Sequence, residues 1–169
     1  MTPPTNIRPP VLHYRPVRWR DCMWVWRLAN DPEVRAASMH LQAIALHAHV
    51  RWFVARMRAP LPWWVISREG RRVGMQRIDP TDPVLGSVPV LTTWIHPEER
   101  GGRVGSVALA QVRAMLPGLD LRGRIRPENT RSIRACVAAG WVHGAPVGDW
   151  ETVYAWPRQD NYNEAGELV

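Results

Sequence analysis

Apolar residues recur at helical spacing in the first third of the chain. Residues 11–17 read as a first strand, and Asp21 is placed to cap a helix that ends at the turn signal of residues 30–32. A second helix is predicted over residues 44–59, because one of its faces is apolar and indicates packing against a core. The apolar positions on that face follow the pattern i, i+3, i+4 and i+7, and they are Val50, Phe53, Val54 and Met57.

Strand patterns fill the middle of the chain. Residues 63–67 and 73–78 are rich in β-branched and aromatic or apolar side chains, and the pair Glu69-Gly70 between them predicts a hairpin. A further strand over residues 88–95 ends at His96 and a proline. The middle of the chain therefore predicts three strands in succession.

Strands and helices alternate in the rest of the chain. A helix is predicted from residue 103 to residue 115, and a second helix starts at the capping residue Asn129 and ends at Gly140, where a left-handed residue is usual. Short strands flank these helices at residues 121–125, 141–143 and 151–156. Two strand–helix–strand crossovers argue for an α/β fold, with a mixed sheet and helices on both faces.

The length of 169 residues allows one domain, which we expect over residues 11–157, between loose ends at 1–10 and 158–169. No apolar run reaches the roughly 18 residues that span a bilayer, and the N-terminus lacks a signal-peptide core, so we expect a cytoplasmic protein without membrane contact. Cys22 and Cys136 have no second ligand at metal-binding spacing, which predicts no metal site.

The net charge of +7 indicates a polyanionic partner, such as nucleic acid or a phosphorylated small molecule. All 22 basic residues are arginine, which excludes a phosphate-binding or Schiff-base lysine. The arginines are scattered rather than clustered, and this weakens the nucleic-acid interpretation. Charge alone leaves coenzyme A and nucleotide sugars open as ligands.

A glycine-rich segment joins the strand over residues 88–95 to the next helix. Unpaired amides at a helix start attract anions, and Gly101, Gly102 and Gly105 let the backbone approach a phosphate closely. The segment suits a pyrophosphate, although a glycine-rich turn that only joins two elements is the simpler alternative.

The run IHPEERGGRVGSVAL, residues 95–109, resembles the acetyl-CoA loop of the GNAT superfamily of N-acetyltransferases. The family pattern is Arg or Gln, two residues, Gly, any residue, then Gly or Ala. Arg100 and Gly105 match the ends of this pattern, whereas Arg103 stands at its inner glycine. The resemblance implies a cofactor loop made of Arg100, Gly101, Gly102, Arg103, Val104, Gly105 and Ser106.

The resemblance also implies that the preceding strand binds the pantetheine amides through the backbone of Trp94, Ile95 and His96. An amide near Ile95 would then polarise the thioester carbonyl. The run RPENTRSIRACVAAGW, residues 126–141, resembles the family's later strand–helix segment. Four of its residues share a helical face that can line the pantetheine arm, namely Asn129, Ser132, Cys136 and Gly140. The family fold is a mixed sheet splayed between its fourth and fifth strands.

Catalysis needs an unprotonated amine and a proton for the departing thiolate. Cys136 stands where many family members carry a tyrosine acid, and a buried packing role is its alternative. Tyr154 is a second candidate acid. His96 and His40 are candidate bases, because histidine titrates near neutral pH, and a water chain is the alternative to both.

Two segments in the first half, N30DPEVR35 and H49VRWF53, resemble the subgroup that acetylates the 4-amino group of nucleotide-linked sugars. In this interpretation Arg35 pairs with the diphosphate, and His49, Trp52 and Phe53 flank the acceptor on one helical face. Core packing is the alternative for both aromatic residues.

The leading hypothesis is therefore an acetyl-CoA-dependent N-acetyltransferase, monomeric or homodimeric, acting on a nucleotide-linked amino sugar. A protein or ribosomal-protein N-acetyltransferase is the nearest alternative. A non-catalytic nucleic-acid-binding module, which would use the arginines and 10 tryptophans, is the third.

Overall fold

The computed structural model describes residues 9–156. Most of the predicted loose ends, residues 1–8 and 157–169, lie outside this part of the chain. The described residues form a seven-stranded sheet in the order β1-β2-β3-β4-β5-β7-β6. Its strands are β1 His13–Pro16, β2 Trp63–Arg68, β3 Arg71–Asp79, β4 Val90–Ile95, β5 Arg122–Ile125, β6 Val142–Val147 and β7 Trp150–Tyr154.

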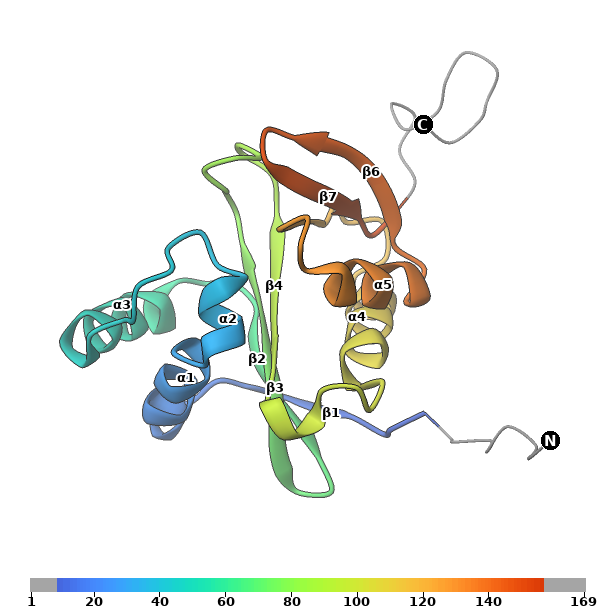
Figure 1. Ribbon diagram of the computed structural model, residues 1–169. Coiled ribbons are helices and arrows are strands. Elements are labelled where there is room, and N and C mark those ends of the chain that lie inside the picture. Colours follow the sequence, from blue (N-terminus) through green and yellow to red (C-terminus); the bar gives the residue numbers. More distant parts are fainter. Residues whose placement is uncertain (1–8, 157–169) are drawn as a thin grey trace, which may run out of the picture.

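Helices lie on both sides of this sheet, with α1 to α3 on one side of β4 and α4 and α5 on the other (Figure 1). They are α1 Cys22–Ala29, α2 Pro32–Ala36, α3 Leu46–Arg58, α4 Val104–Met115 and α5 Thr130–Ala138, with 3-10 turns at Trp19–Asp21 and Pro97–Glu99. The α/β class and the mixed sheet are thereby confirmed.

The sheet is splayed between β4 and β5. These two strands are parallel and share one register pair, Val90 with Arg122, whereas every other neighbouring pair in the sheet is antiparallel. Beyond that pair the two strands diverge, and the backbone edges that face the gap are not bonded to each other. The splay that the family resemblance implied is therefore present.

The core is divided between the two faces of the sheet. On one face α1 and α3 bury Val25, Leu28 and Phe53 against Val65 and Met75. On the other face the cores under α4 and α5 have as members Ile66, Val73, Val104, Ala108, Leu109, Ile125, Cys136 and Val153. Because successive residues of a strand point to opposite faces of the sheet, burial of apolar side chains on both faces fixes the register of each strand.

The turn and the helix ends predicted at residues 69–70, 129 and 140 are confirmed. Glu69 and Gly70 both have positive φ, 50° and 79°, as a tight hairpin turn requires. The side chain of Asn129 accepts a hydrogen bond from the amide of Ser132 at the start of α5. Gly140 ends that helix with a φ of 80°.

Three details of the first half differ from the prediction. The signal at residues 30–32 starts a further helix, α2, which Asp31 caps by accepting from the amide of Val34. Asp21 does not cap α1, since its buried carboxylate accepts from the amide of Arg18 and from the Arg15 guanidinium instead.

The buried face of α3 is also different from the predicted stripe. Met57 is 41% exposed, whereas His49, Phe53 and Arg56 are buried. Arg56 reaches inward because its guanidinium donates to the carbonyl of Ile78 at 2.7 Å. A buried polar side chain with a bonded partner thus occupies a position that the apolar pattern did not reveal.

Candidate active site

A cavity of about 560 Å³ lies in the splay between β4 and β5. All six residues of β4 line one wall, and Gly123, Arg124 and Ile125 of β5 line the opposite wall. The N-terminal part of α4 and the inner face of α5 close it on one side, and α2 with the segment that follows it closes the other. One continuous space thus joins the glycine-rich loop to the face of the sheet under α2.

The glycine-rich loop presents its backbone to this cavity. Gly101 and Arg103 both have positive φ, 82° and 63°, and Arg103 occupies the N-cap position of α4. The first amides of a helix have no partner within the helix, so the start of α4 offers N–H groups and a positive dipole end to an anion. Of the expected loop residues, Arg100, Gly101, Arg103, Gly105 and Ser106 line the cavity. Gly102 lies on the outer surface near β1, and Val104, the first residue of α4, is buried.

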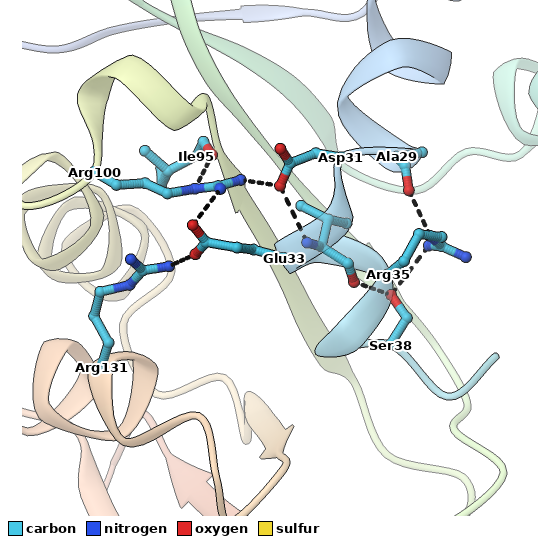
Figure 2. A network of polar contacts seen from close by, with 9 residues as sticks. Ala29, Asp31, Glu33, Arg35, Ser38, Ile95, Arg100 and Arg131 are labelled. Carbon is cyan, nitrogen blue, oxygen red and sulfur yellow. Dashed lines mark hydrogen bonds and ion pairs between the residues drawn. The ribbon is translucent and has the colours of Figure 1, made fainter. Parts of the chain in front are cut away.

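The side chain of Arg100 is committed to the protein rather than to the cavity. It donates to the carbonyl of Ile95 at 3.1 Å and to Asp31 at 2.6 Å, and it pairs with Glu33 at 3.2 Å. Glu33 also bonds Arg131 of α5, and Figure 2 shows this carboxylate between the two arginines. The network ties α2, on one side of the cavity, to the glycine-rich loop and α5 on the other.

Strand geometry decides which amides of β4 face the gap. The amide of His96 donates to the carbonyl of Val73 at 2.8 Å, so the backbone groups of His96 point toward β3. Because these groups alternate along an antiparallel pair, Trp94 also bonds toward β3, whereas Thr93 and Ile95 face β5. Of residues 94–96, which were expected to bind pantetheine, only Ile95 therefore turns its backbone groups toward β5, and Thr93 does so as well.

The inner face of α5 completes the cofactor side of the cavity. Asn129, Ser132 and Cys136 line it, as their shared helical face predicts, whereas Gly140 does not. Burial raises the pKa of the Cys136 thiol to about 12. A thiol in that range is a weaker acid than an ordinary thiol, whose pKa is roughly 8.5, so Cys136 is poorly suited to protonate a departing thiolate. Its place in the core favours the packing alternative.

The other catalytic candidates are separated by the fold. His40 lines the cavity from the segment after α2, and its side chain is exposed. His96 and Tyr154 are not among the lining residues. Tyr154 of β7 stacks instead with Arg122 of β5, with 5.4 Å between the guanidinium and the ring centre. His40 is therefore the candidate base that the structure places at the cavity.

The acceptor residues expected on α3 are not brought to the cavity. His49 is buried, with Nε2 3.0 Å from the carbonyl oxygen of Cys22, and Phe53 is fully buried in the core. Trp52 is half-buried and stacks with Trp63. This face of α3 points into the core because α1 covers it, so core packing, the alternative weighed from the sequence, describes it.

Arg35 lines the cavity, and each nitrogen of its guanidinium makes one bond within the protein. It donates to the carbonyl of Ala29 at 2.5 Å and to the hydroxyl of Ser38 at 3.0 Å (Figure 2). It also donates to the carbonyl of His40 at 3.2 Å. These bonds fix the segment after α2 over the cavity, which is a structural role. Three of the five guanidinium N–H groups are thus engaged, which leaves fewer for the expected bidentate contact with a diphosphate.

Sequence reasoning missed six charged residues of the lining, and three of them lie away from the glycine-rich loop, α2 and α5, namely Arg77, Asp82 and Arg124. They come from β3, the loop before β4, and β5, so no local motif joins them. An alternation of charged with apolar residues along β3 and β5 is the one signal in the sequence, and it is common to many exposed strands.

The chain belongs to the acetyltransferase (GNAT) domain family, whose pattern matches residues 12–142. It is accordingly an acyl-CoA-dependent N-acetyltransferase that uses acetyl-CoA as its acyl donor. A comparison with curated proteins finds no significant match. Because this is a family of enzymes, the membership argues against the third hypothesis, a non-catalytic nucleic-acid-binding module.

Solved structures share this fold at low sequence identity. Spermidine N-acetyltransferase from Vibrio cholerae, in complex with CoA and spermine, has a TM-score of 0.70 at 10% identity, over 85% of this chain and 92% of that one. An aminoglycoside acetyltransferase with coenzyme A and kanamycin has a TM-score of 0.68 at 15% identity, over 85% and 92%. Ribosomal-protein-alanine N-acetyltransferase from Brucella melitensis has a TM-score of 0.65 at 20% identity, over 84% and 96%.

The residues around the cavity fit acetyl-CoA. The amides at the start of α4 suit the pyrophosphate, and the free edge of β4 at Thr93 and Ile95 suits the pantetheine amides. Within residues 9–156 no group of three or more His, Cys, Asp or Glu side chains is arranged to hold a metal ion. No helix in the same part of the chain is long and apolar enough to cross a membrane.

Proposed function

We propose that the protein acetylates the primary amine of a small molecule that carries phosphate, with a nucleotide-linked amino sugar as the favoured acceptor. The charge of the cavity carries this proposal. Among the described lining residues, six arginines face three carboxylates, which come from Glu33, Asp82 and Glu99. The arginines are Arg35, Arg77, Arg100, Arg103, Arg124 and Arg131.

The excess of arginine persists away from the cofactor loop. Arg35, Arg77 and Arg124 line the part of the cavity under α2, where Asp82 is paired with Arg124 at 2.6 Å. Polyamines and aminoglycosides carry several positive charges and would be repelled from such a surface. An amine on an anionic carrier is attracted to it, and this supports the acceptor proposed.

The chain's own groups account for the main requirements of acyl transfer. Acetyl-CoA supplies the acetyl group as a thioester. The amides of Thr93 and Ile95 are the donors on the free edge of β4 that can stabilise negative charge on the thioester oxygen. The amine nitrogen attacks the carbonyl carbon, the carbon–sulfur bond breaks, and CoA leaves and is protonated. His40, which lines the cavity, is the proposed acceptor of the proton that the amine loses.

The proposal is tested by measuring free-thiol release from acetyl-CoA with four classes of acceptor. These are nucleotide-linked amino sugars, spermidine, kanamycin and peptides with a free N-terminal alanine. We expect the highest kcat/KM with a nucleotide-linked amino sugar, and at least about tenfold less with the polycations, since a charge-assisted contact is worth on the order of 1.5–3 kcal/mol. Efficient use of peptides with no activity on sugar nucleotides would reject the proposal and favour the protein N-acetyltransferase.

A further inference from the structure

We infer that Arg77 and Arg124 form a clamp that binds the phosphate groups of the acceptor, one from each side of β4. The inference deepens the proposed function and rests on it for the nature of the acceptor. It assigns the role that the sequence suggested for Arg35 to two residues on neighbouring strands. We call this pair the arginine clamp.

The register of the sheet places the two arginines in one row. Arg77 of β3 lies opposite Thr92 of β4. Val90 of β4 lies opposite Arg122 of β5, and because these strands are parallel, Thr92 and Arg124 follow two residues further along. Strands are spaced by about 4.8 Å, so the Cα atoms of the arginines are roughly 10 Å apart, or more where the sheet splays.

The two side chains also share a face of the sheet. Ile78, Leu91 and Ile125, which are the chain neighbours of Arg77, Thr92 and Arg124, pack in the core under α4 and α5. Successive strand residues point to opposite faces, so the row itself faces the side that α2 covers. All three row residues line the cavity.

Arg77 is held in place on three sides. Its Nε donates to Asp79 at 2.8 Å, and its guanidinium lies 5.1 Å from the ring centre of Trp52 and 5.4 Å from that of Trp94. Within residues 9–156 its two terminal nitrogens have no hydrogen-bond partner. Trp52 therefore supports the acceptor side indirectly, by orienting an arginine that reaches the cavity.

Arg124 is held in the same manner. Its Nε donates to Asp82 at 2.6 Å, and its guanidinium lies 4.3 Å from the ring centre of Trp150. Asp82 is itself fixed by the amides of Val84 and Leu85, at 2.9 and 3.1 Å. In the described part of the chain, the terminal nitrogens of Arg124 are likewise without a hydrogen-bond partner.

This arrangement is suited to phosphate. A guanidinium fixed at Nε and stacked on an indole keeps its terminal N–H groups directed outward, and little conformational entropy remains to be lost on binding. The side chains are 18% and 16% exposed, so the charges are only partly screened by water. Two such groups flanking Thr92 can each bind one phosphate of a diphosphate.

The test compares one amino sugar in two forms, a uridine-diphosphate-linked 4-amino sugar and its methyl glycoside. Calorimetry with saturating CoA, which fills the cofactor loop, measures binding of each form. We expect R77Q and R124Q each to weaken binding of the diphosphate form by about tenfold or more, and to leave binding of the methyl glycoside unchanged. R124K keeps a positive charge beside Asp82, so it tests whether the effect of R124Q comes from misfolding. R124K should lose the bidentate contact and weaken diphosphate binding less than R124Q does.

R122Q is the matched control, since Arg122 lies on the same face of β5 but does not line the cavity. It should bind both forms like the wild type. Diphosphate binding that is unchanged in R77Q and R124Q, or an equal loss for both sugar forms, would overturn the clamp.

Binding of inorganic pyrophosphate tests the arginine clamp independently of the proposed function. The CoA-loaded protein should bind it, and R77Q and R124Q should weaken that binding. If no sugar nucleotide supports thiol release but pyrophosphate binding depends on both arginines, the acceptor assignment fails and the clamp stands. If sugar nucleotides are acetylated equally well by the wild type and both variants, the proposed function stands and the clamp is wrong.

Discussion

The guanidinium of Arg100 donates a hydrogen bond of 2.6 Å to the carboxylate of Asp31, across 69 positions of the chain. Arg100 begins the glycine-rich loop, and Asp31 caps α2, which covers the cavity from the other side. Both side chains are largely buried, at 12% and 13% exposure. The first residue of the family pattern therefore connects the glycine-rich loop to α2.

We expect Arg100→Ala to lower the free energy of unfolding by about 2–4 kcal/mol, because it leaves a buried carboxylate without its charged partner. Acetyl-CoA affinity should fall as well, since the loop loses its anchor on α2. Glu33→Gln is the control: Glu33 is 58% exposed, and its exposed pairs should contribute less than about 1 kcal/mol. Urea unfolding and calorimetry measure both quantities, and equal stability of the two variants would refute this role of Arg100.

Arg103 should be a strained residue. It stands where the family pattern has glycine, and its φ of 63° is the left-handed conformation that glycine adopts most easily. Arg103→Gly should be more stable than Arg103→Ala by roughly 1–2 kcal/mol, a comparison in which neither variant keeps the long side chain.

The opposite change at Gly101 provides the control for this strain. Its φ is 82°, and an added Cβ would meet no atom within 4 Å. Gly101→Ala should therefore destabilise the protein by roughly 1 kcal/mol through backbone conformation alone. Thermal unfolding of the three variants tests both statements, and equal stability of the two Arg103 variants would show that the loop relaxes.

Replacement of Cys136 by alanine should leave turnover nearly unchanged. The thiol is buried, and its raised pKa makes it a poor proton donor. We expect kcat within about twofold of the wild type and a loss of stability of about 1 kcal/mol, the usual size of a small core truncation. A tenfold loss of kcat at unchanged acetyl-CoA affinity would instead establish the thiol as the acid.

His49 should make stability depend on pH in the weakly acidic range. Burial lowers the pKa of His49, and the hydrogen bond to the carbonyl of Cys22 only partly opposes this. Below about pH 6.5 the unfolded chain takes up a proton that the folded protein does not, so the contribution of His49 is lost as the pH falls toward the folded pKa. The slope can reach about 1.4 kcal/mol per pH unit.

His49→Gln removes the titrating ring and keeps a donor for the carbonyl of Cys22. Its free energy of unfolding should therefore change less between pH 6.5 and 5 than that of the wild type, as urea unfolding at several pH values can measure. The same change at His47, which is exposed on α3, should leave the profile as it is. Parallel profiles for all three proteins would contradict the assignment.

Local signals predicted most of the elements because they act over a few residues. The hairpin at Glu69-Gly70, the cap at Asn129 and the stop at Gly140 all depend on backbone preferences within one turn. α2 was missed because five residues are too few to show a helical period. The buried face of α3 was misread because Arg56 donates to two carbonyls outside the helix. They belong to Pro62 in the loop before β2, 6 residues away, and to Ile78 on β3, 22 residues away.

The sequence by itself determined the α/β class, the cofactor loop and the family, because the glycine-rich loop and the capped helix after it lie in continuous segments. Tertiary structure alone decided which charges line the cavity away from this loop. Arg35 makes three bonds within its own segment, whereas Arg77 and Arg124 are aligned by strand register and stacked on tryptophans from other elements. The tryptophans that orient Arg77 and Arg124 lie far from them in the chain, so the orientation of these two arginines is absent from any local pattern.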